Sequence, residues 1–596
     1  MEVLREADFK RVGAYDIRDI LKTAVGLDVG EASVTDTSMV GNRVSLRGMG
    51  SNATLILIDG RRVGGEDSGS TANVYELSRI PLSNVDHIEI LRGSGSALYG
   101  SDAVGGVINI ITKRDEEESG YAGAKTGGRS SSVYGGYSTG KQGRLSLNFN
   151  YDLTKTRKYN IKQNTNMFGP RSSFEFSGDY ELSDHSGLDF GAGFMQERLR
   201  QNMPTGDTWY DNNRSNYHVK YYGNDVKNDW EVQSYYSRLG KVSRGQNALG
   251  RWDNFNNARY STWVNEAKNT YRMDKDNTLT YGVEYKKNKV GGTRYNDGGR
   301  IRFESRSGMP GITEPYGSGD CSSYAFYLQD ETQLGPKLFF VPSVRFDHYS
   351  GFGTEWTPRA GLTYNFTKNS RLKMNYGRSY RAPTIFDMYG YMDHAFGPMH
   401  IYVLGNPNLE PEKAVNFDIG LEGERGKATG KLTYFHNKIS NLIDYVTMPT
   451  GSRFNRIYRY QNINRAVMEG LEAEAGYNFD KHWSAKANYT YLDARDGNSH
   501  TRLTNRAFNT GTVELAWTDA RQNPWTATLY NQWYQNYLDG NHHSHSYSTT
   551  NFVVTKTIGK LYAYAGVDNV FDKTFGEDSE LQIYGRTWRT GVEWKF

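Results

Sequence analysis

The chain has 596 residues and a formal net charge of only +4. So weak a charge gives no support for nucleic-acid binding, which depends on a strongly basic surface. Mean hydropathy is −0.73, and the longest strongly apolar runs, such as Leu55–Ile58, span only a few residues. A transmembrane helix needs about 20 apolar residues, so the sequence excludes one. The single cysteine, Cys321, excludes an internal disulfide and any site built from several thiolates.

The first 114 residues have the patterns of a small mixed α+β domain. The expected elements are one helix and three short apolar strands, in chain order over 18–22, 54–60, 85–92 and 105–112. The acidic run 115–118 then predicts a solvated junction. We therefore expect one domain over 1–114 and a second domain over 115–596.

From about residue 120 onward, the chain consists of segments that alternate apolar and polar residues. One example is 145–153, and the last nine residues, 588–596, alternate without a break and end on the aromatic Phe596. Strands with one apolar and one polar face are what a transmembrane β-barrel presents to lipid and to its lumen. The composition agrees, because 44 Tyr and 11 Trp suit aromatic girdles and 65 Gly suit turns. A soluble protein of β-sandwiches or propellers is the alternative.

Short turns alternate with long polar connections along this second region. The turns are expected at 141–143 and 559–560, and the long connections at 199–216, 242–258 and 290–322. The region suits an all-β barrel of about 22 antiparallel strands, each with roughly 10 membrane-embedded residues. Because so wide a lumen would be an open hole, we expect the α+β domain to lie inside the barrel. We also expect the protein to be a monomer. An exported protein needs a secretory signal, which we expect to have been removed from this chain.

The order of short motifs resembles the TonB-dependent outer-membrane receptors. Motifs similar to the plug domain come first and motifs similar to the barrel follow, at Asn42–Gly48, Leu57–Gly60, Ile88–Gly93, Ala97–Ala103, Gly106–Thr112, Tyr380–Pro383, Asn406–Glu412, Val567–Asp572 and Phe596. The resemblance implies a transporter in the outer membrane of a Gram-negative-type bacterium, in contact with its lipid and with a periplasmic TonB-type energy-transducing protein. We expect the segment that binds this protein to precede Glu2, outside the sequence.

The candidate functions belong to different classes of protein: an active transporter, a passive porin or an adhesin barrel. A passive porin would lack the first domain, and an adhesin barrel would carry a translocated passenger instead. An enzyme finds no support, because the sequence contains no nucleophile elbow, phosphate loop, zinc-protease motif or dinucleotide fingerprint. The sequence therefore favours an active transporter.

The resemblance also implies contacts between the plug and the barrel. Two plug arginines of the family face two barrel acids, and the matching positions are Arg47 and Arg92 in the plug and Asp418 and Glu472 in the barrel. The family usually has Glu where this chain has Asp418, which shortens that side chain by one methylene. The alternative is that these residues are ordinary charges facing the lumen.

The resemblance leaves the transported ligand open among haem, a ferric siderophore, cobalamin and, less often, free metals or sugars, and we favour haem. The loop between Pro383 and Asn406 resembles the haem-uptake subfamily, in which a histidine of this loop binds the iron. His394 is the expected ligand and His400 its rival, since neutral imidazole binds haem iron well. That subfamily usually adds a histidine from a plug loop, but the loop 64–76 contains none, so Tyr75 is the expected substitute. Haem, free or from a haemoprotein, would be cargo, and no cofactor is expected to stay bound.

A second histidine cluster is expected in an extracellular loop near the C-terminus. Three histidines occur within four residues, at His542, His543 and His545. Such a group can collect a transition metal or contact an incoming haem. The alternative is an ordinary solvated loop.

Overall fold

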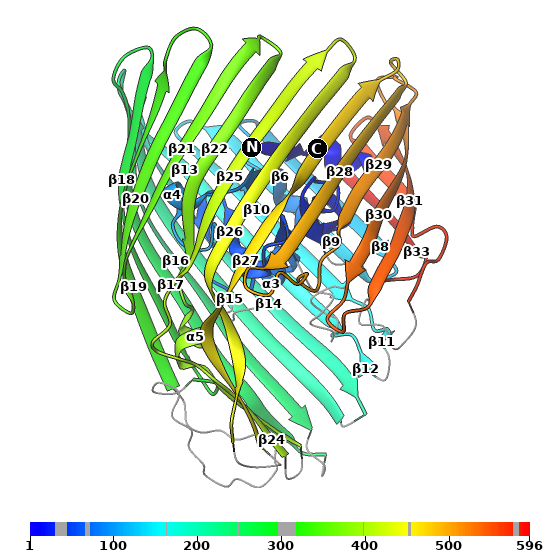
Figure 1. Cartoon of the computed structure of the whole chain (residues 1–596). Helices are drawn as coiled ribbons and strands as arrows, with labels where there is room; N and C mark the ends of the chain where they lie inside the picture. The colour runs from blue at the N-terminus through cyan, green and yellow to red at the C-terminus, as the bar shows by residue number, and fades with distance from the viewer. Residues whose placement is uncertain are drawn as a thin grey trace.

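A computed structural model of the chain describes residues 1–29, 44–65, 72–161, 164–204, 206–246, 250–295, 317–396, 399–450, 455–575 and 583–596. The described residues form a closed β-barrel whose lumen holds the N-terminal domain as a plug (Figure 1). Among the described helices, none is both long and apolar enough to cross a membrane.

The plug is a small α+β unit, as the sequence predicts. Its elements are β1 (Glu2–Arg5), α1 (Glu6–Arg11), α2 (Ile17–Leu21), β2 (Leu27–Val29), β3 (Val44–Leu46), η1 (Ser51–Ala53), β4 (Thr54–Ile58), β5 (Arg61–Arg62), α3 (Ala72–Arg79), η2 (Leu82–Asn84), β6 (Val85–Arg92), α4 (Ser96–Tyr99) and β7 (Gly106–Thr112). Five of the strands form one sheet in the order β1-β6-β7-β4-β5, in which only β4 and β7 are parallel.

The plug core forms where helix α2 packs onto the sheet. Ile17 and Leu21 of α2 and Ile88 and Ile108 of the sheet are all fully buried in one apolar cluster. The helix begins at Asp16, whose side chain accepts the backbone N–H of residue 19 at 3.1 Å. This cap satisfies a donor that the helix leaves unpaired, so a very short helix can keep its position against the sheet.

Twenty-two antiparallel strands close the barrel, which confirms the expected architecture. They are β8 (Glu118–Gly127), β9 (Ser130–Gln142), β10 (Leu145–Thr156), β13 (Gly169–Ser183), β14 (Ser186–Met203), β15 (Gly206–Asn224), β16 (Asn228–Gln246), β17 (Trp252–Arg272), β18 (Asn277–Gly292), β19 (Gly317–Gln333), β20 (Leu338–Tyr349), β21 (Gly353–Thr367), β22 (Ser370–Arg381), β25 (Glu412–Arg425), β26 (Ala428–Met448), β27 (Asn455–Asn478), β28 (Trp483–Asp496), β29 (Asn509–Thr518), β30 (Trp525–Leu538), β31 (Ser544–Ile558), β32 (Leu561–Asp568) and β33 (Thr587–Lys595). Strands β33 and β8 pair and close the ring.

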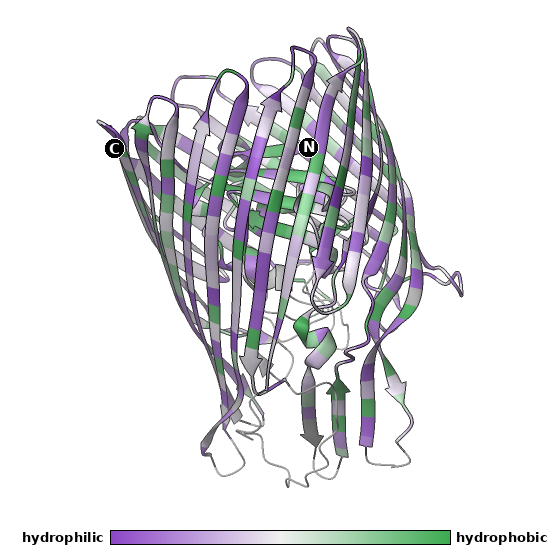
Figure 2. Ribbon diagram, turned by 90° about the vertical axis from the view of Figure 1, so that its left-hand side faces the viewer, coloured by the Kyte–Doolittle hydropathy of each residue, from purple (hydrophilic) through white to green (hydrophobic). Residues whose placement is uncertain are grey.

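Alternation along each strand separates a lipid-facing surface from the lumen. In β33, Trp588 is 70% exposed and Trp594 is 52% exposed, whereas Arg589 and Glu593 are buried. Hydrophobic and hydrophilic residues alternate in this way along the barrel strands (Figure 2). The terminal Phe596 exchanges two backbone hydrogen bonds with Gly120 of β8, at 2.8 and 3.0 Å. The final aromatic residue therefore takes part in closing the barrel.

The strands extend farther into the long-loop end of the barrel than the sequence predicts. The expected long connection at 199–216 is a continuous hairpin of β14 and β15, and strands β16 and β17 take up most of 242–258. Polar side chains do not end these strands, because each strand still pairs with an antiparallel neighbour through backbone hydrogen bonds. Of the three expected connections, only 290–322 leaves a long stretch of sequence between its strands, since β18 ends at Gly292 and β19 begins at Gly317.

Between β22 and β25 the chain makes an excursion at the long-loop end. It contains the helix α5 (Ile385–Tyr389) and the hairpin β23 (Tyr391–Phe396) and β24 (Met399–Leu404). The hairpin lies beyond the barrel rim, where β24 pairs in parallel with the start of β27 (Figure 1). A small two-stranded sheet, β11 (Asn160–Ile161) with β12 (Asn164–Thr165), follows β10.

Candidate functional site

The clearest functional geometry is where the plug meets the barrel wall. Arg47 of the plug is 3% exposed, and its Nε and Nη2 each donate to Glu472 at 2.9 Å. Its Nη1 donates to Asp418, so one guanidinium joins acids of β27 and β25. The ring of Phe435, on the strand between them, lies 4.6 Å from the guanidinium carbon. Burial alone would lower the pKa of Arg47, but the two carboxylates hold this pKa above its ordinary value.

Two plug glycines make room for the barrel acids. Gly26 has φ +69°, and a Cβ there would lie 2.0 Å from Glu472 Oε1. Gly93 has φ +80°, and a Cβ there would lie 2.7 Å from Asp418 Oδ2. Each glycine therefore combines a backbone conformation that L-residues avoid with a close approach to a carboxylate. The resemblance identified both acids in advance, but the sequence did not indicate that these two glycines face them.

Arg92 has a different partner from the one that the resemblance implies. Its Nη2 donates to Glu2 of strand β1 and to the carbonyl of Val25 at 2.7 Å, and its Nε donates to the same carbonyl at 3.0 Å. All these hydrogen bonds lie within the plug. Burial works to lower the pKa of Arg92, and Glu2 followed by Glu472 raises it above the ordinary value. The structure thus brings Arg47 between both barrel acids, whereas Arg92 fastens β1 to the plug body.

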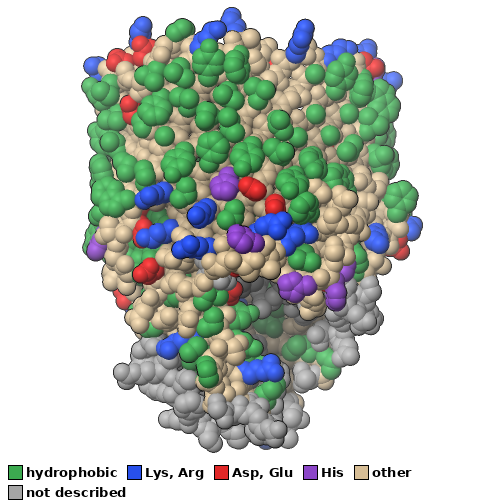
Figure 3. All heavy atoms as spheres, in the orientation of Figure 1, with side chains coloured by type: hydrophobic (Ala, Val, Ile, Leu, Met, Phe, Trp, Pro, Cys, Tyr) green, Lys and Arg blue, Asp and Glu red, His purple; other side chains and the backbone are tan. Residues whose placement is uncertain are grey.

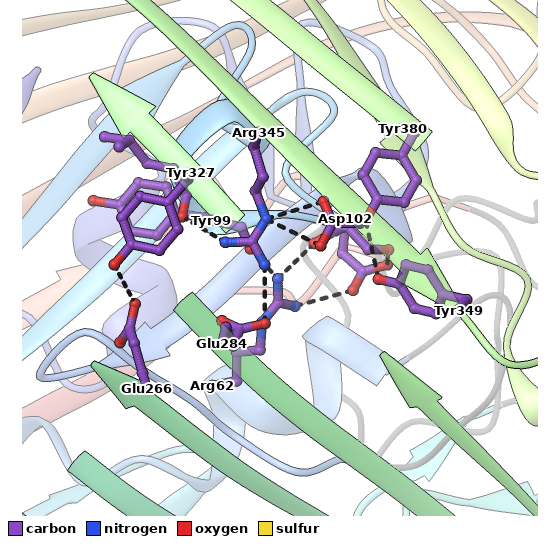
Figure 4. A network of polar contacts seen from close by, with 12 residues as sticks. Arg62, Tyr99, Asp102, Glu266, Glu284, Tyr327, Arg345, Tyr349 and Tyr380 are labelled. Carbon is purple, nitrogen blue, oxygen red and sulfur yellow. Dashed lines mark hydrogen bonds and ion pairs between the residues drawn. The ribbon is translucent and has the colours of Figure 1, made fainter. Parts of the chain in front are cut away.

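A second polar network joins another side of the plug to the barrel (Figure 4). Arg345 of β20 is 1% exposed and donates to Asp347 at 3.0 Å, to Glu284 of β18 at 3.0 Å and to the plug carbonyl of Leu98 at 3.2 Å. Gly100 lets this arginine approach, because a Cβ there would lie 3.1 Å from Nη2. Here the cation belongs to the barrel and the plug supplies an acceptor at the end of helix α4.

The plug side of this network is organised by Arg62. This side chain donates to Asp102 at 3.2 Å and to the carbonyls of Tyr99 and Ser101, the latter at 2.9 Å. The backbone N–H of Arg62 donates to the Tyr235 hydroxyl of the barrel at 3.3 Å. Arg62 therefore shapes the plug turn that meets Arg345. The sequence alternation places Arg345 on the lumen side of β20, but it cannot name these partners.

Helix α3 provides a third contact, in which two plug charges lie between two barrel charges and the sign alternates along the chain of four. Arg214 of β15 donates to Glu76 of α3 at 2.6 Å, and Glu76 pairs with Arg79 of the same helix at 3.5 Å. Arg79 in turn donates to Glu197 of β14 at 3.2 Å. All four side chains are less than a tenth exposed. Such a chain tolerates burial because each charge has an opposite neighbour.

Arg589 of the last strand makes a fourth contact with the plug. It donates to the carbonyls of Gly13 at 2.7 Å and Val12 at 3.0 Å, and to the Tyr530 hydroxyl at 2.9 Å. Its guanidinium also pairs with Asp568 at 2.9 Å. These four contacts fasten the plug at separate places on the inner wall, and an arginine is central to each.

The residues expected to bind haem do not form a site that the structure describes. The backbones of His394 and Tyr75 lie in β23 and α3, but both side chains are outside the described residues. His400 of β24 bonds Asp393 at 2.9 Å and stacks on Tyr402 at 5.7 Å between ring centroids. In Figure 1, β24 lies beyond the barrel rim and α3 lies inside the barrel. His400 is thus engaged within its own hairpin.

The C-terminal histidines gather around an aspartate. His545 Nε2 lies 2.9 Å from Asp539 Oδ2, and His543 Nδ1 lies 3.6 Å from the same oxygen. His542 is in the connection, at φ +64°, while His545 belongs to β31, so this strand extends into the loop expected from the sequence. Burial alone would raise the pKa of Asp539, but the hydrogen bonds from His545 and from the His543 backbone lower it. Among the described residues, no group of three or more His, Cys, Asp or Glu side chains could hold a metal ion.

The long-loop end of the lumen has an aromatic wall. Phe386 of α5 packs edge-on against Tyr295 at 5.8 Å and against Tyr460 at 6.3 Å between ring centroids. Tyr295 in turn meets Tyr260 of β17 at 6.5 Å. Helix α5 begins with Thr384, whose hydroxyl accepts the N–H of residue 387 at 3.0 Å. This cap holds the apolar face of α5 against the inner wall, on the long-loop side of the plug.

The barrel faces lipid, and buried ion pairs fasten a plug inside its lumen. These features define the class of plugged outer-membrane receptors. Family comparison agrees: residues 1–107 match the TonB-dependent Receptor Plug Domain, and residues 91–570 match the TonB dependent receptor-like β-barrel. The chain belongs to the TonB-dependent receptor family. Members of this family are receptors and transporters rather than enzymes.

Similar proteins include receptors named for iron complexes. The ferric enterobactin receptor of Pseudomonas aeruginosa is 26% identical over 546 residues, which cover 78% of this chain and 71% of that protein. A crystal structure of that receptor with enterobactin superposes with TM-score 0.83 at 20% identity, covering 100% of this chain and 99% of that one. The siderophore receptor PirA of the same organism gives 0.77 at 22% identity, covering 100% and 99%. These structural likenesses show the fold.

The comparisons also correct the ligand expected from the sequence. They favour ferric-siderophore receptors and give no support for a haem-specific subfamily. The histidine spacing after Tyr380–Pro383 is therefore insufficient to assign haem. Any exposed polar loop can contain histidines, and here His400 already has an aspartate as its partner.

Proposed function

We propose that this protein takes up a ferric siderophore from the extracellular side, with energy from a periplasmic TonB-type protein. The similarity to ferric enterobactin receptors over most of both chains carries the proposal. Residues 1–114 serve as the plug and residues 115–596 as the barrel. The aromatic wall formed around Phe386 lies on the side from which the ligand enters, and it offers packing surface to a bulky iron complex.

The fastening of the plug supports active rather than passive transport. Removing one partner from a buried ion pair costs about 3–5 kcal/mol, and the plug has such pairs at several places. Thermal motion alone would rarely release all of them together, so an external source of work is needed to open a path. This expectation separates the receptor from a passive porin.

A competition among three iron compounds tests the ligand. Purified protein is titrated with ferric enterobactin, ferric citrate and hemin, and binding is followed by quenching of tryptophan fluorescence and by the Soret band of hemin. We expect saturable binding of a ferric siderophore and no Soret shift. A shifted Soret band with no siderophore binding would restore the haem alternative.

Uptake of radioactive iron in cells tests the energy source. Cells that express the receptor should accumulate iron from the bound siderophore only when their TonB-type protein is functional. Equal uptake in cells that lack this protein would contradict active transport, even if the ligand assignment held.

A further inference from the structure

A transverse row of cations crosses the outer surface of the barrel. Strand register aligns Arg378 of β22 with Val415, Val415 with Lys438 of β26, Lys438 with Val467, and Val467 with Arg495 of β28. The row therefore alternates cations with valines on five neighbouring strands. Strands lie about 4.8 Å apart, so successive cations are about 10 Å from each other. Arg378, Lys438 and Arg495 are all exposed.

The row faces outward and marks the edge of the apolar belt. The next row of outward-facing side chains lies two residues nearer the short turns and begins at Tyr376, which is 56% exposed. The rows after it are apolar and include Leu421 and Leu432, which are 50% and 52% exposed. Arg378 is the ninth residue of β22, which starts at a short turn. About 9–11 tilted residues cross the hydrocarbon, so the cations lie at the boundary on the long-loop side. Figure 3 shows a band of Lys, Arg and His just beyond the apolar belt.

Two of these cations have no anion beside them within the described part of the chain. The side chains of Arg378 and Lys438 make no ion pair or hydrogen bond with any described residue. Arg495 differs, because its Nε bonds both carboxylate oxygens of Asp493, at 3.0 and 2.9 Å. One more acid, Glu469, occupies the row that begins at Tyr376, where it pairs with a histidine. Lys and Arg cost little at the edge of hydrocarbon, where their charged ends reach the headgroups, so anions from outside the protein can pair with them there.

We propose that this row, the β22–β28 cation row (Arg378, Lys438 and Arg495), binds the phosphates of a phosphorylated lipid in the outer leaflet. The valines between the cations contact the acyl chains, and the cations meet phosphates at headgroup depth. This inference depends on the outer-membrane location and is separate from the siderophore site, which opens into the lumen. It gives the receptor an annulus of anionic lipid on the face formed by β22 and β25–β28.

Lipid binding by neutralised variants tests the row. The full chain with Arg378→Gln and Lys438→Gln is titrated in detergent micelles with bis-phosphorylated lipid A, and binding is read by native mass spectrometry. A surface cation contributes about 1 kcal/mol near an anionic membrane surface, so we expect binding to weaken about 5-fold per cation and about 30-fold for both. The matched control is Lys368→Gln with Lys481→Gln, which removes two cations from the short turns of the opposite rim and should bind as tightly as wild type.

Dephosphorylated lipid A separates phosphate recognition from contact with acyl chains. Wild-type protein should bind the dephosphorylated lipid at least as weakly as the double variant, which keeps Arg495, binds the phosphorylated one, and excess inorganic phosphate should compete poorly. Equal binding of the two lipids by wild type, or equal binding of lipid A by wild type and the double variant, would overturn the proposal. If the double variant fails to fold, the single variants and the lipid comparison still decide. Ferric siderophore binding, measured on the same samples, should be unchanged, and its absence in wild type would contradict only the proposed function.

Discussion

Removing the guanidinium of Arg47 should unseat the plug from the barrel wall. Arg47→Met keeps much of the side-chain volume but leaves Asp418 and Glu472 without their shared cation, and these acids are only 6% and 2% exposed. Breaking a buried pair from one side costs about 3–5 kcal/mol. At about 1.4 kcal/mol per factor of ten, this would shift the balance between seated and released plug by roughly 150- to 4,000-fold.

The assay is the leak through the barrel. Cells that express Arg47→Met should admit a large antibiotic that wild type excludes, and the plug of the purified variant should exchange its amide hydrogens faster. A triple variant that adds Asp418→Asn and Glu472→Gln removes the unpaired charges and should recover much of the lost seating, because neutral polar groups are far less costly to bury. If the triple variant leaks as much as Arg47→Met, or if neither leaks more than wild type, the buried charge at this contact is not what holds the plug.

Three further outcomes follow from the same contacts. Arg345→Met should also increase the leak, since it leaves Glu284 and Asp347 without their cation in the buried network of Figure 4. The double variant with Arg47→Met should leak more than either single variant. If it leaks no more, the two contacts do not act separately. Deletion of Phe596 should lower the amount of assembled barrel in the outer membrane, measured by heat-modifiable gel mobility, because the residue closes the sheet onto Gly120. His400→Ala should leave ferric enterobactin affinity within about 2-fold of wild type, and a tenfold loss would return this hairpin to the ligand site.

The sequence alone was sufficient to predict the barrel and the plug. Alternation in 588–596 has a direct physical reading, because successive side chains of a strand point to opposite faces and lipid accepts only apolar ones. The same reasoning placed Arg589 on the lumen side and Trp588 on the lipid side, as the structure confirms. The number of strands followed from the length of the second region, since each crossing of the membrane takes a similar number of residues.

The resemblance grouped Arg47 and Arg92 with Asp418 and Glu472, but only the tertiary structure decided which of these charges meet. Arg47 and Glu472 are separated by 425 positions, and nothing local in either segment specifies the other. Arg92 occupies a motif like that of Arg47, yet it bonds Glu2 because strand β1 pairs with β6 and brings that carboxylate alongside. Alternation indicates that a side chain faces the lumen, but its partner there depends on how the plug is rotated inside the barrel. That orientation is set by packing over the whole inner wall and is absent from any single stretch of sequence.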